Sequence, residues 1–77
     1  MSKLQILSAK EVEYLLFSLG FQKIRQKGSH VFYKHPDGRT TTVPHHPGRD
    51  LSRPLFRSIL RDIRLSLPEF SNLLKKI

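Results

Sequence analysis

The chain opens with a helical pattern. After Leu7 and Ser8, apolar residues recur at helical spacing and form one stripe: Val12, Leu15, Leu16 and Leu19. Ser8 and Glu11 have the spacing of a capping box, in which each side chain bonds the backbone N–H of the other residue. Gly20 follows at the point where a residue in the left-handed region often ends a helix. These signals predict a helix over about residues 9–19.

Beyond Gly20 the pattern changes to strands and tight turns. Residues 21–27 read as a strand in which basic residues recur at spacing two, at Lys23, Arg25 and Lys27. In a regular strand these three side chains share one face. A Gly-Ser turn leads to an aromatic and β-branched strand over 30–34, and a Pro-Asp-Gly turn leads to a third strand over 39–43. The pattern therefore predicts a three-stranded antiparallel sheet.

A second helical region follows a proline-flanked loop over residues 44–50. Ser52 is expected to cap it, with Pro54 in its first turn, and its buried stripe is predicted to be Leu55, Ile59, Leu60 and Ile63. Ser66 and Glu69 repeat the capping box and predict a short last helix with apolar residues Phe70, Leu73, Leu74 and Ile77. The element order α-β-β-β-α-α indicates an α+β fold.

Positive charge is concentrated in the middle of the chain. The 77 residues carry a net charge of +8. Residues 21–64 hold ten basic and three acidic residues, so this stretch alone carries 10 − 3 = +7. Seven of the ten are arginines, whose planar guanidinium binds phosphate with two parallel hydrogen bonds. The pattern favours a polyanionic partner such as RNA, although a charged surface that only keeps the protein soluble is the simpler alternative.

Composition excludes several functional classes. The absence of cysteine rules out disulfides, zinc–thiolate sites, iron–sulfur clusters and cysteine nucleophiles. No apolar run approaches the ~18–20 residues of a membrane span, and the first residues lack a signal-peptide core. We therefore expect a cytoplasmic location and no membrane contact. The chain is also too short for a two-lobed enzyme with a closing cleft.

Four histidines are the remaining candidates for chemistry. His35 lies beside Pro36 and reads as a turn residue. His45 and His46 are adjacent in the loop, but no cysteine and few carboxylates are present to complete a metal site. Bracing the loop or contacting a phosphate is the better interpretation of this pair. We expect no metal and no cofactor.

His30 has the most suggestive setting, directly after Lys27, Gly28 and Ser29. Gly28 lets the backbone approach a ligand closely, Ser29 offers a hydroxyl, and Lys27 offers a positive charge. An imidazole there could take the proton of an RNA 2′-hydroxyl or protonate the departing 5′-oxygen, while nearby cations stabilise the charge that builds on phosphorus. From the residues alone, a purely structural histidine is the alternative.

The order of these motifs resembles the HicA toxin family. The resemblance rests on Arg-Gln-Lys-Gly-Ser-His over 25–30, the aromatic strand, the turn over 35–38, and Val43-Pro44 with His46, and it covers about residues 8–74. It implies a double-stranded-RNA-binding-domain-like fold, in which a three-stranded antiparallel sheet packs on two main helices. The implied order is α-β-β-β-α with a short extra C-terminal helix.

The chain is too short for more than one domain, so residues 1–77 are expected to form a single domain of this type. Residues 1–7 extend beyond many members of the family and are expected to be flexible. The resemblance also implies a function, that of the toxin of a type II toxin–antitoxin system: a metal-independent endoribonuclease that binds and cleaves mRNA and inhibits translation. Its expected partner is a HicB-type antitoxin. The family's catalytic histidine corresponds to His30, its glycine and serine to Gly28 and Ser29, and its later histidine to His46.

Several points stay open. The residues expected to hold the RNA backbone are Lys23, Arg25, Lys27 and Lys34. The second proton-transfer group is a lysine, water or a histidine of a second copy, and the oligomeric state is undecided. Two alternative functions are a non-catalytic RNA-binding module, which would read shape, phosphates and 2′-hydroxyls, and an interaction protein whose basic face meets only an acidic partner.

Overall fold

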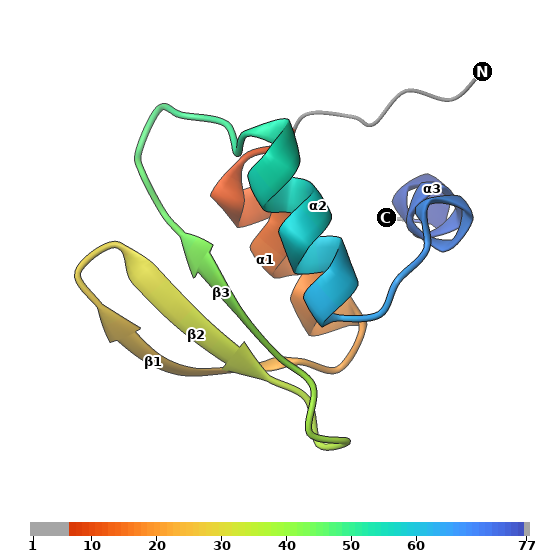
Figure 1. Ribbon diagram of the computed structural model, residues 1–77, viewed down its shortest axis with the longest axis horizontal. Helices are drawn as coiled ribbons and strands as arrows, with labels where there is room; N and C mark the ends of the chain where they lie inside the picture. The colour runs from red at the N-terminus through yellow and green to blue at the C-terminus, as the bar shows by residue number, and fades with distance from the viewer. Residues whose placement is uncertain (1–6, 77) are drawn as a thin grey trace.

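Six elements follow one another in the predicted order (Figure 1). In the computed structural model, which describes residues 7–76 and the side chains of 7–66 and 68–73, they are α1 (Ala9–Ser18), β1 (Gln22–Lys27), β2 (His30–Lys34), β3 (Thr40–Pro44), α2 (Arg53–Asp62) and α3 (Leu67–Lys76). The α+β class is therefore confirmed, and the order is compatible with a double-stranded-RNA-binding-like fold. Each helix of the described residues has ten residues, about half of what a membrane span needs, so none of them could span a bilayer.

The first helix begins with the predicted capping box. The Ser8 hydroxyl accepts the Glu11 N–H at 3.2 Å, and the Glu11 carboxylate accepts the Ser8 N–H at 2.9 Å. Leu7 is only 3% exposed, and its carbonyl accepts the N–H of Leu51 at 2.8 Å. Leu7 is thus anchored in the core, whereas residues 1–6 of the segment expected to be flexible lie outside the described residues.

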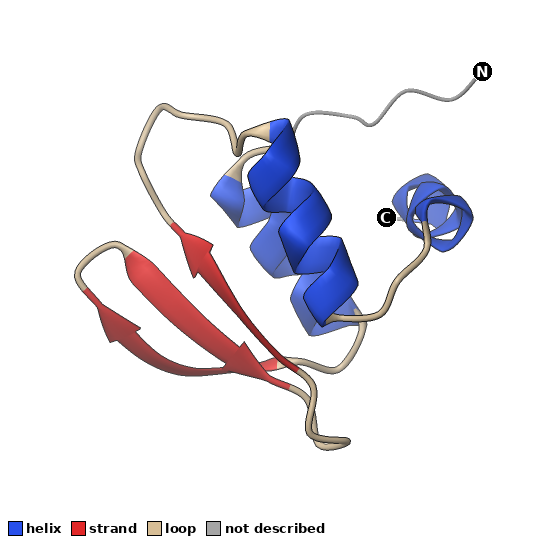
Figure 2. Ribbon diagram, viewed as in Figure 1, coloured by secondary structure: helices blue, strands red, loops and turns tan. Residues whose placement is uncertain are grey.

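The three strands form an antiparallel sheet in the order β1-β2-β3. Alternation along β2 and β3 separates two faces, of which one is buried against the helices: Val31, Tyr33, Thr41 and Val43. Both α1 and α2 pack against β3, and Figure 2 shows the strand β1 lying farthest from them. We call the opposite face, formed by the outward side chains of β1, β2 and β3, the outer face. Its side chains on β2 and β3 are exposed or half-buried.

A bulge in β1 corrects the prediction that its three basic residues share one face. Lys23 pairs with Tyr33, but Arg25 pairs with Phe32, so the register shifts at Ile24. Because directly paired residues point to the same face, Arg25 and Lys27 belong to the outer face, and Lys23 lies on the side of Tyr33 and the helices. The prediction is wrong for Lys23, since the period of two holds only in an unbulged strand.

The core also differs from the stripe predicted for α2. Ile59, Leu60 and Ile63 are buried as predicted, but Leu55 is only partly buried and Phe56 is 2% exposed. Phe56 is covered by Phe70 of α3, with ring centroids 4.9 Å apart in a T-shaped arrangement. A third helix packed on α2 therefore widens its buried face. The side chains of Leu74 and Ile77, predicted for the apolar side of α3, lie outside the described residues.

The ends of α1 and α2 share one geometry but use different residues. After α1, Gly20 has φ +99° and the N–H of Phe21 bonds the Leu16 carbonyl at 2.9 Å. After α2, Arg64 has φ +57° and the N–H of Leu65 bonds the Leu60 carbonyl at 3.0 Å. Both are Schellman motifs, in which glycine is the favoured left-handed residue. Arginine there carries a strain that glycine avoids.

Arg64→Gly is expected to raise the free energy of unfolding by about 0.5–1 kcal/mol, because glycine adopts a positive φ without steric cost. Gly20→Ala is the reverse control: a Cβ there would also lie 3.1 Å from Nε2 of His35, so stability should fall. Urea denaturation of the two variants beside the parent chain measures both shifts. A destabilised Arg64→Gly variant would show that the arginine side chain makes a contact worth more than the strain.

Candidate active site

The turn between β1 and β2 fixes the position of His30. Gly28 has φ +59° and Ser29 has an ordinary negative φ, which is the pattern of a type II′ hairpin turn. Lys27 and His30 are paired across this turn, and the carbonyl of Ser29 accepts the N–H of His45 at 2.7 Å. The glycine is thus required by the turn itself, and the exposed imidazole of His30 starts β2 on the outer face.

Around His30, the outer face is hollowed into a depression of about 380 Å³, lined by Arg25, Lys27, His30, Phe32 and Thr42. Lys34 extends the same face, two residues beyond Phe32. Among the described side chains, no carboxylate lies within 4.0 Å of the charged groups of Arg25, Lys27 or Lys34. These cations are therefore available to an external anion.

Three of the five residues that line the depression are among the predicted site residues: Arg25, Lys27 and His30. Phe32 and Thr42 were missed as members of the site. The signal was present, because Phe32 is two residues from His30 on one strand and therefore shares its face. Thr42 is its partner on β3, and that pairing becomes visible only once the register is known. The guanidinium of Arg25 lies over the ring of Phe32, 5.2 Å from the ring centroid.

Two of the predicted site residues lie elsewhere. Lys23 faces α1, with its Nζ 3.9 Å from the Glu13 carboxylate. His46 is exposed in the loop after β3 and lines a separate depression of about 620 Å³ beside the start of α1, together with Lys10 and Arg49. Neither side chain lines the depression around His30.

His45 belongs to a polar network behind the sheet. The Tyr33 hydroxyl donates to Glu13 at 2.5 Å and lies 2.9 Å from Nε2 of His45. Since the hydroxyl proton is directed to Glu13, Nε2 of His45 is the donor to the tyrosine oxygen. Burial, reinforced by the hydrogen bond and the negative charge of Glu13, raises the pKa of Tyr33 far above its usual range. His45 thus braces the loop, one of the two roles predicted for it.

The raised pKa of Tyr33 predicts a loss of stability in alkali. Above about pH 10 an unfolded tyrosine loses its proton while the folded one keeps it, so the free energy of unfolding should fall by up to about 1.4 kcal/mol per pH unit. Denaturation curves between pH 9 and 11 measure this slope. Tyr33→Phe should flatten it, whereas Tyr14→Phe, which removes the tyrosine that is 61% exposed, should leave it unchanged. Parallel slopes for Tyr33→Phe and the parent chain would contradict the prediction.

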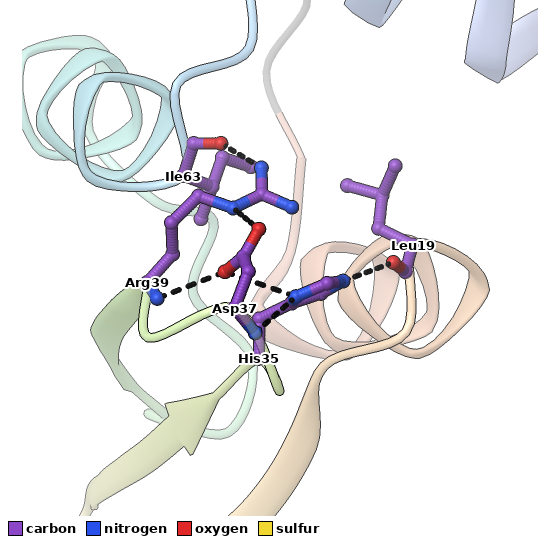
Figure 3. A network of polar contacts seen from close by, with 5 residues as sticks. All are labelled: Leu19, His35, Asp37, Arg39 and Ile63. Atoms are coloured by element: carbon purple, nitrogen blue, oxygen red, sulfur yellow. Dashed lines mark hydrogen bonds and ion pairs between the residues drawn. The ribbon is translucent and has the colours of Figure 1, made fainter.

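The turn before β3 is joined to the end of α1 by His35 and to the end of α2 by Arg39 (Figure 3). The Nε2 of His35 lies 3.1 Å from the Leu19 carbonyl at the end of α1, and its Nδ1 accepts the Asp37 N–H at 3.1 Å. The Asp37 carboxylate accepts the backbone N–H of Arg39 and its Nε, which together hold the pKa of Asp37 below its usual range. Arg39 also donates to the Ile63 carbonyl at the end of α2.

His35 and His45 therefore have structural partners, and His30 and His46 are the two exposed imidazoles. No hydrogen bond to another described side chain holds the His30 ring. Within residues 7–76, no three histidine, aspartate or glutamate side chains are close enough together to hold a metal ion. The outer face thus combines one unengaged imidazole with three unpaired cations and an aromatic ring.

Comparison with known proteins identifies the family. No curated protein sequence matches the chain. Residues 9–65 match the sequence profile of the family described as the HicA toxin of bacterial toxin–antitoxin. The matched stretch runs from the start of α1 to the end of the α2 cap, includes every residue of the His30 depression, and leaves α3 outside. Because it spans well over half of the chain, the protein belongs to the HicA toxin family.

Proposed function

We propose that this toxin is a metal-independent endoribonuclease that binds and cleaves mRNA and so inhibits translation, with His30 as its acid–base residue. The observation that carries the proposal is the exposed, unengaged imidazole of His30 in a depression shared with Arg25 and Lys27. A surface with fixed cations and no neighbouring carboxylate attracts a phosphodiester. A general acid–base group at its centre is what RNA cleavage requires.

In the proposed reaction, the imidazole of His30 takes the proton of a 2′-hydroxyl. The 2′-oxygen forms a bond to the adjacent phosphorus, and the bond from phosphorus to the 5′-oxygen breaks. Water on this open face donates a proton to the departing 5′-oxygen, so the products are a 2′,3′-cyclic phosphate and a 5′-hydroxyl. Lys27, directly across the turn from His30, stabilises the charge that develops on the phosphorus oxygens.

The other residues predicted to contact RNA differ in how directly they act in this proposal. Arg25 and Lys34 lie on the same face as His30 and bind flanking phosphates. Ser29 and Gly28 form the turn that holds His30 in place. Lys23 and His46 lie outside the depression, so they contribute only long-range attraction for RNA that extends beyond it.

The partner in this proposal is a HicB-type antitoxin, since a toxin of this family works in a toxin–antitoxin pair. With a net charge of +8, the toxin favours an antitoxin that supplies carboxylates and covers the outer face. Such a partner would mask His30 and the surrounding cations together. We place both proteins in the cytoplasm, where mRNA is translated.

The direct test incubates the purified protein with RNA in the presence of a metal chelator. We expect cleavage, with 2′,3′-cyclic phosphate and 5′-hydroxyl ends detected by end-specific enzymatic labelling. Binding without cleavage would instead indicate a non-catalytic RNA-binding module. Tight binding to a HicB-type antitoxin with no affinity for RNA would indicate an interaction protein, and either result overturns the proposed activity.

A further inference from the structure

An aromatic side chain lies on the outer face beside His30, where the core does not need it. The inward positions of β2 are filled by Val31 and Tyr33, which are 1% and 0% exposed. Phe32 points the other way and is half-buried among polar neighbours. Its cross-strand partners are Arg25 on β1 and Thr42 on β3. A large apolar ring therefore lies partly exposed at the centre of a cationic surface.

The spacing along β2 relates this ring to the proposed chemistry. His30 and Phe32 are two residues apart on one face, so their Cα atoms are about 6.8 Å apart, twice the rise per residue of an antiparallel strand. A phosphodiester at His30 thus has a neighbouring nucleobase within reach of Phe32. Both side chains line the same depression, so one nucleotide could contact both without crossing another element.

Arg25 adds a second planar group beside the ring. Its guanidinium lies over the Phe32 ring at 5.2 Å from the centroid, and it has no carboxylate partner among the described side chains. Aromatic rings and guanidinium planes are the two side-chain surfaces on which unpaired RNA bases stack. Thr42, paired with Phe32 on the neighbouring strand β3, offers a hydroxyl to the edge of a base.

We infer that Phe32 and Arg25, with Thr42 beside them, form a nucleobase subsite next to His30, and that the substrate is RNA with an unpaired nucleotide at the point of cleavage. In a duplex, the faces of each base are covered by its neighbours and its pairing edge is engaged, so the base cannot reach the ring. Because every base has a π-face, the subsite selects for unpaired nucleotides more than for sequence. The inference rests on the proposed function and names its substrate class.

The test measures binding of short 2′-O-methyl RNA, which cannot be cleaved by attack of its 2′-oxygen. Three probes are compared: a single strand, the same strand with one abasic nucleotide scanned along it, and its duplex. The parent chain should bind the intact single strand about 5- to 100-fold more tightly than the abasic strand that loses the most affinity in the scan. It should also bind the single strand more tightly than the duplex.

Two variants then assign the difference to the subsite. Phe32→Leu should lose most of the preference for the intact strand over the abasic strand, and Arg25→Lys, which keeps the charge but not the plane, should lose part of it. Phe32→Leu should leave the salt dependence of binding unchanged, whereas Lys27→Gln should lower its slope by about one, as expected for a phosphate contact. Tyr14→Leu, at an aromatic residue that is 61% exposed on α1, is the matched control and should keep the full preference.

Two results would overturn the inference: equal or tighter binding of the duplex, or a folded Phe32→Leu variant that distinguishes intact from abasic strands as well as the parent chain does. Cleavage of unmodified RNA is measured separately. Base preference without cleavage would overturn the proposed endoribonuclease and support the subsite. Cleavage without base preference would support the proposed endoribonuclease and overturn the subsite.

Discussion

His30→Ala is expected to lower the rate of RNA cleavage by about 100- to 10,000-fold, the range that a positioned general acid–base group contributes. The remaining rate would come from the cations of the outer face, which bind and polarise the phosphodiester. The fold should survive, because the His30 side chain is exposed and no hydrogen bond links its ring to another described side chain. Single-turnover cleavage measures the rate, and a thermal melt checks that the fold is intact.

His46→Ala is the comparison for this variant. His46 is also exposed but lines the depression beside α1, so the loss of rate should stay below about tenfold, as for one peripheral contact of about 1 kcal/mol. In cells, growth inhibition should follow the same ranking. A His30→Ala protein that is folded and still cleaves RNA at the parental rate would exclude His30 as the acid–base residue.

Phe70→Ala is expected to lower the free energy of unfolding by about 3–5 kcal/mol, the usual loss for a buried phenylalanine. Phe70 is 2% exposed and meets the Phe56 ring at 4.9 Å, so its removal opens a cavity between α3 and α2. A domain of this length has a total stability of only about 4–12 kcal/mol. The variant therefore loses a large fraction of its total stability and should unfold at a lower urea concentration than the parent chain.

Asn72→Ala is the matched control, because Asn72 is exposed on the same helix and its loss should change stability by less than about 0.5 kcal/mol. Urea denaturation of both variants gives the comparison. A loss below about 1 kcal/mol for Phe70→Ala would contradict the packing of α3 on α2. Since α3 lies outside the residues that match the family, the expected loss would make it a stabilising addition to the shared fold.

The sequence by itself determined the elements and the position of His30, because the signals involved are local. Both capping boxes, at Ser8 and Ser66, form as predicted, since they need only residues three apart in one turn of helix. The hairpin at Gly28 is equally local, and it sets His30 at the start of β2 whatever packs behind the sheet. The family membership also follows from these motifs in order.

Only the tertiary structure decided which side chains meet. The bulge at Ile24 moved Lys23 to the face of Tyr33, because sheet register depends on the pairing strand as well as on the alternation within one strand. Phe56 became a core residue because α3 covers it. The position of Phe32 between Arg25 and Thr42 required the register of all three strands. Each of these contacts joins residues that are distant in sequence. Their free energy depends on how the strands and helices pack together, so no local pattern specifies them.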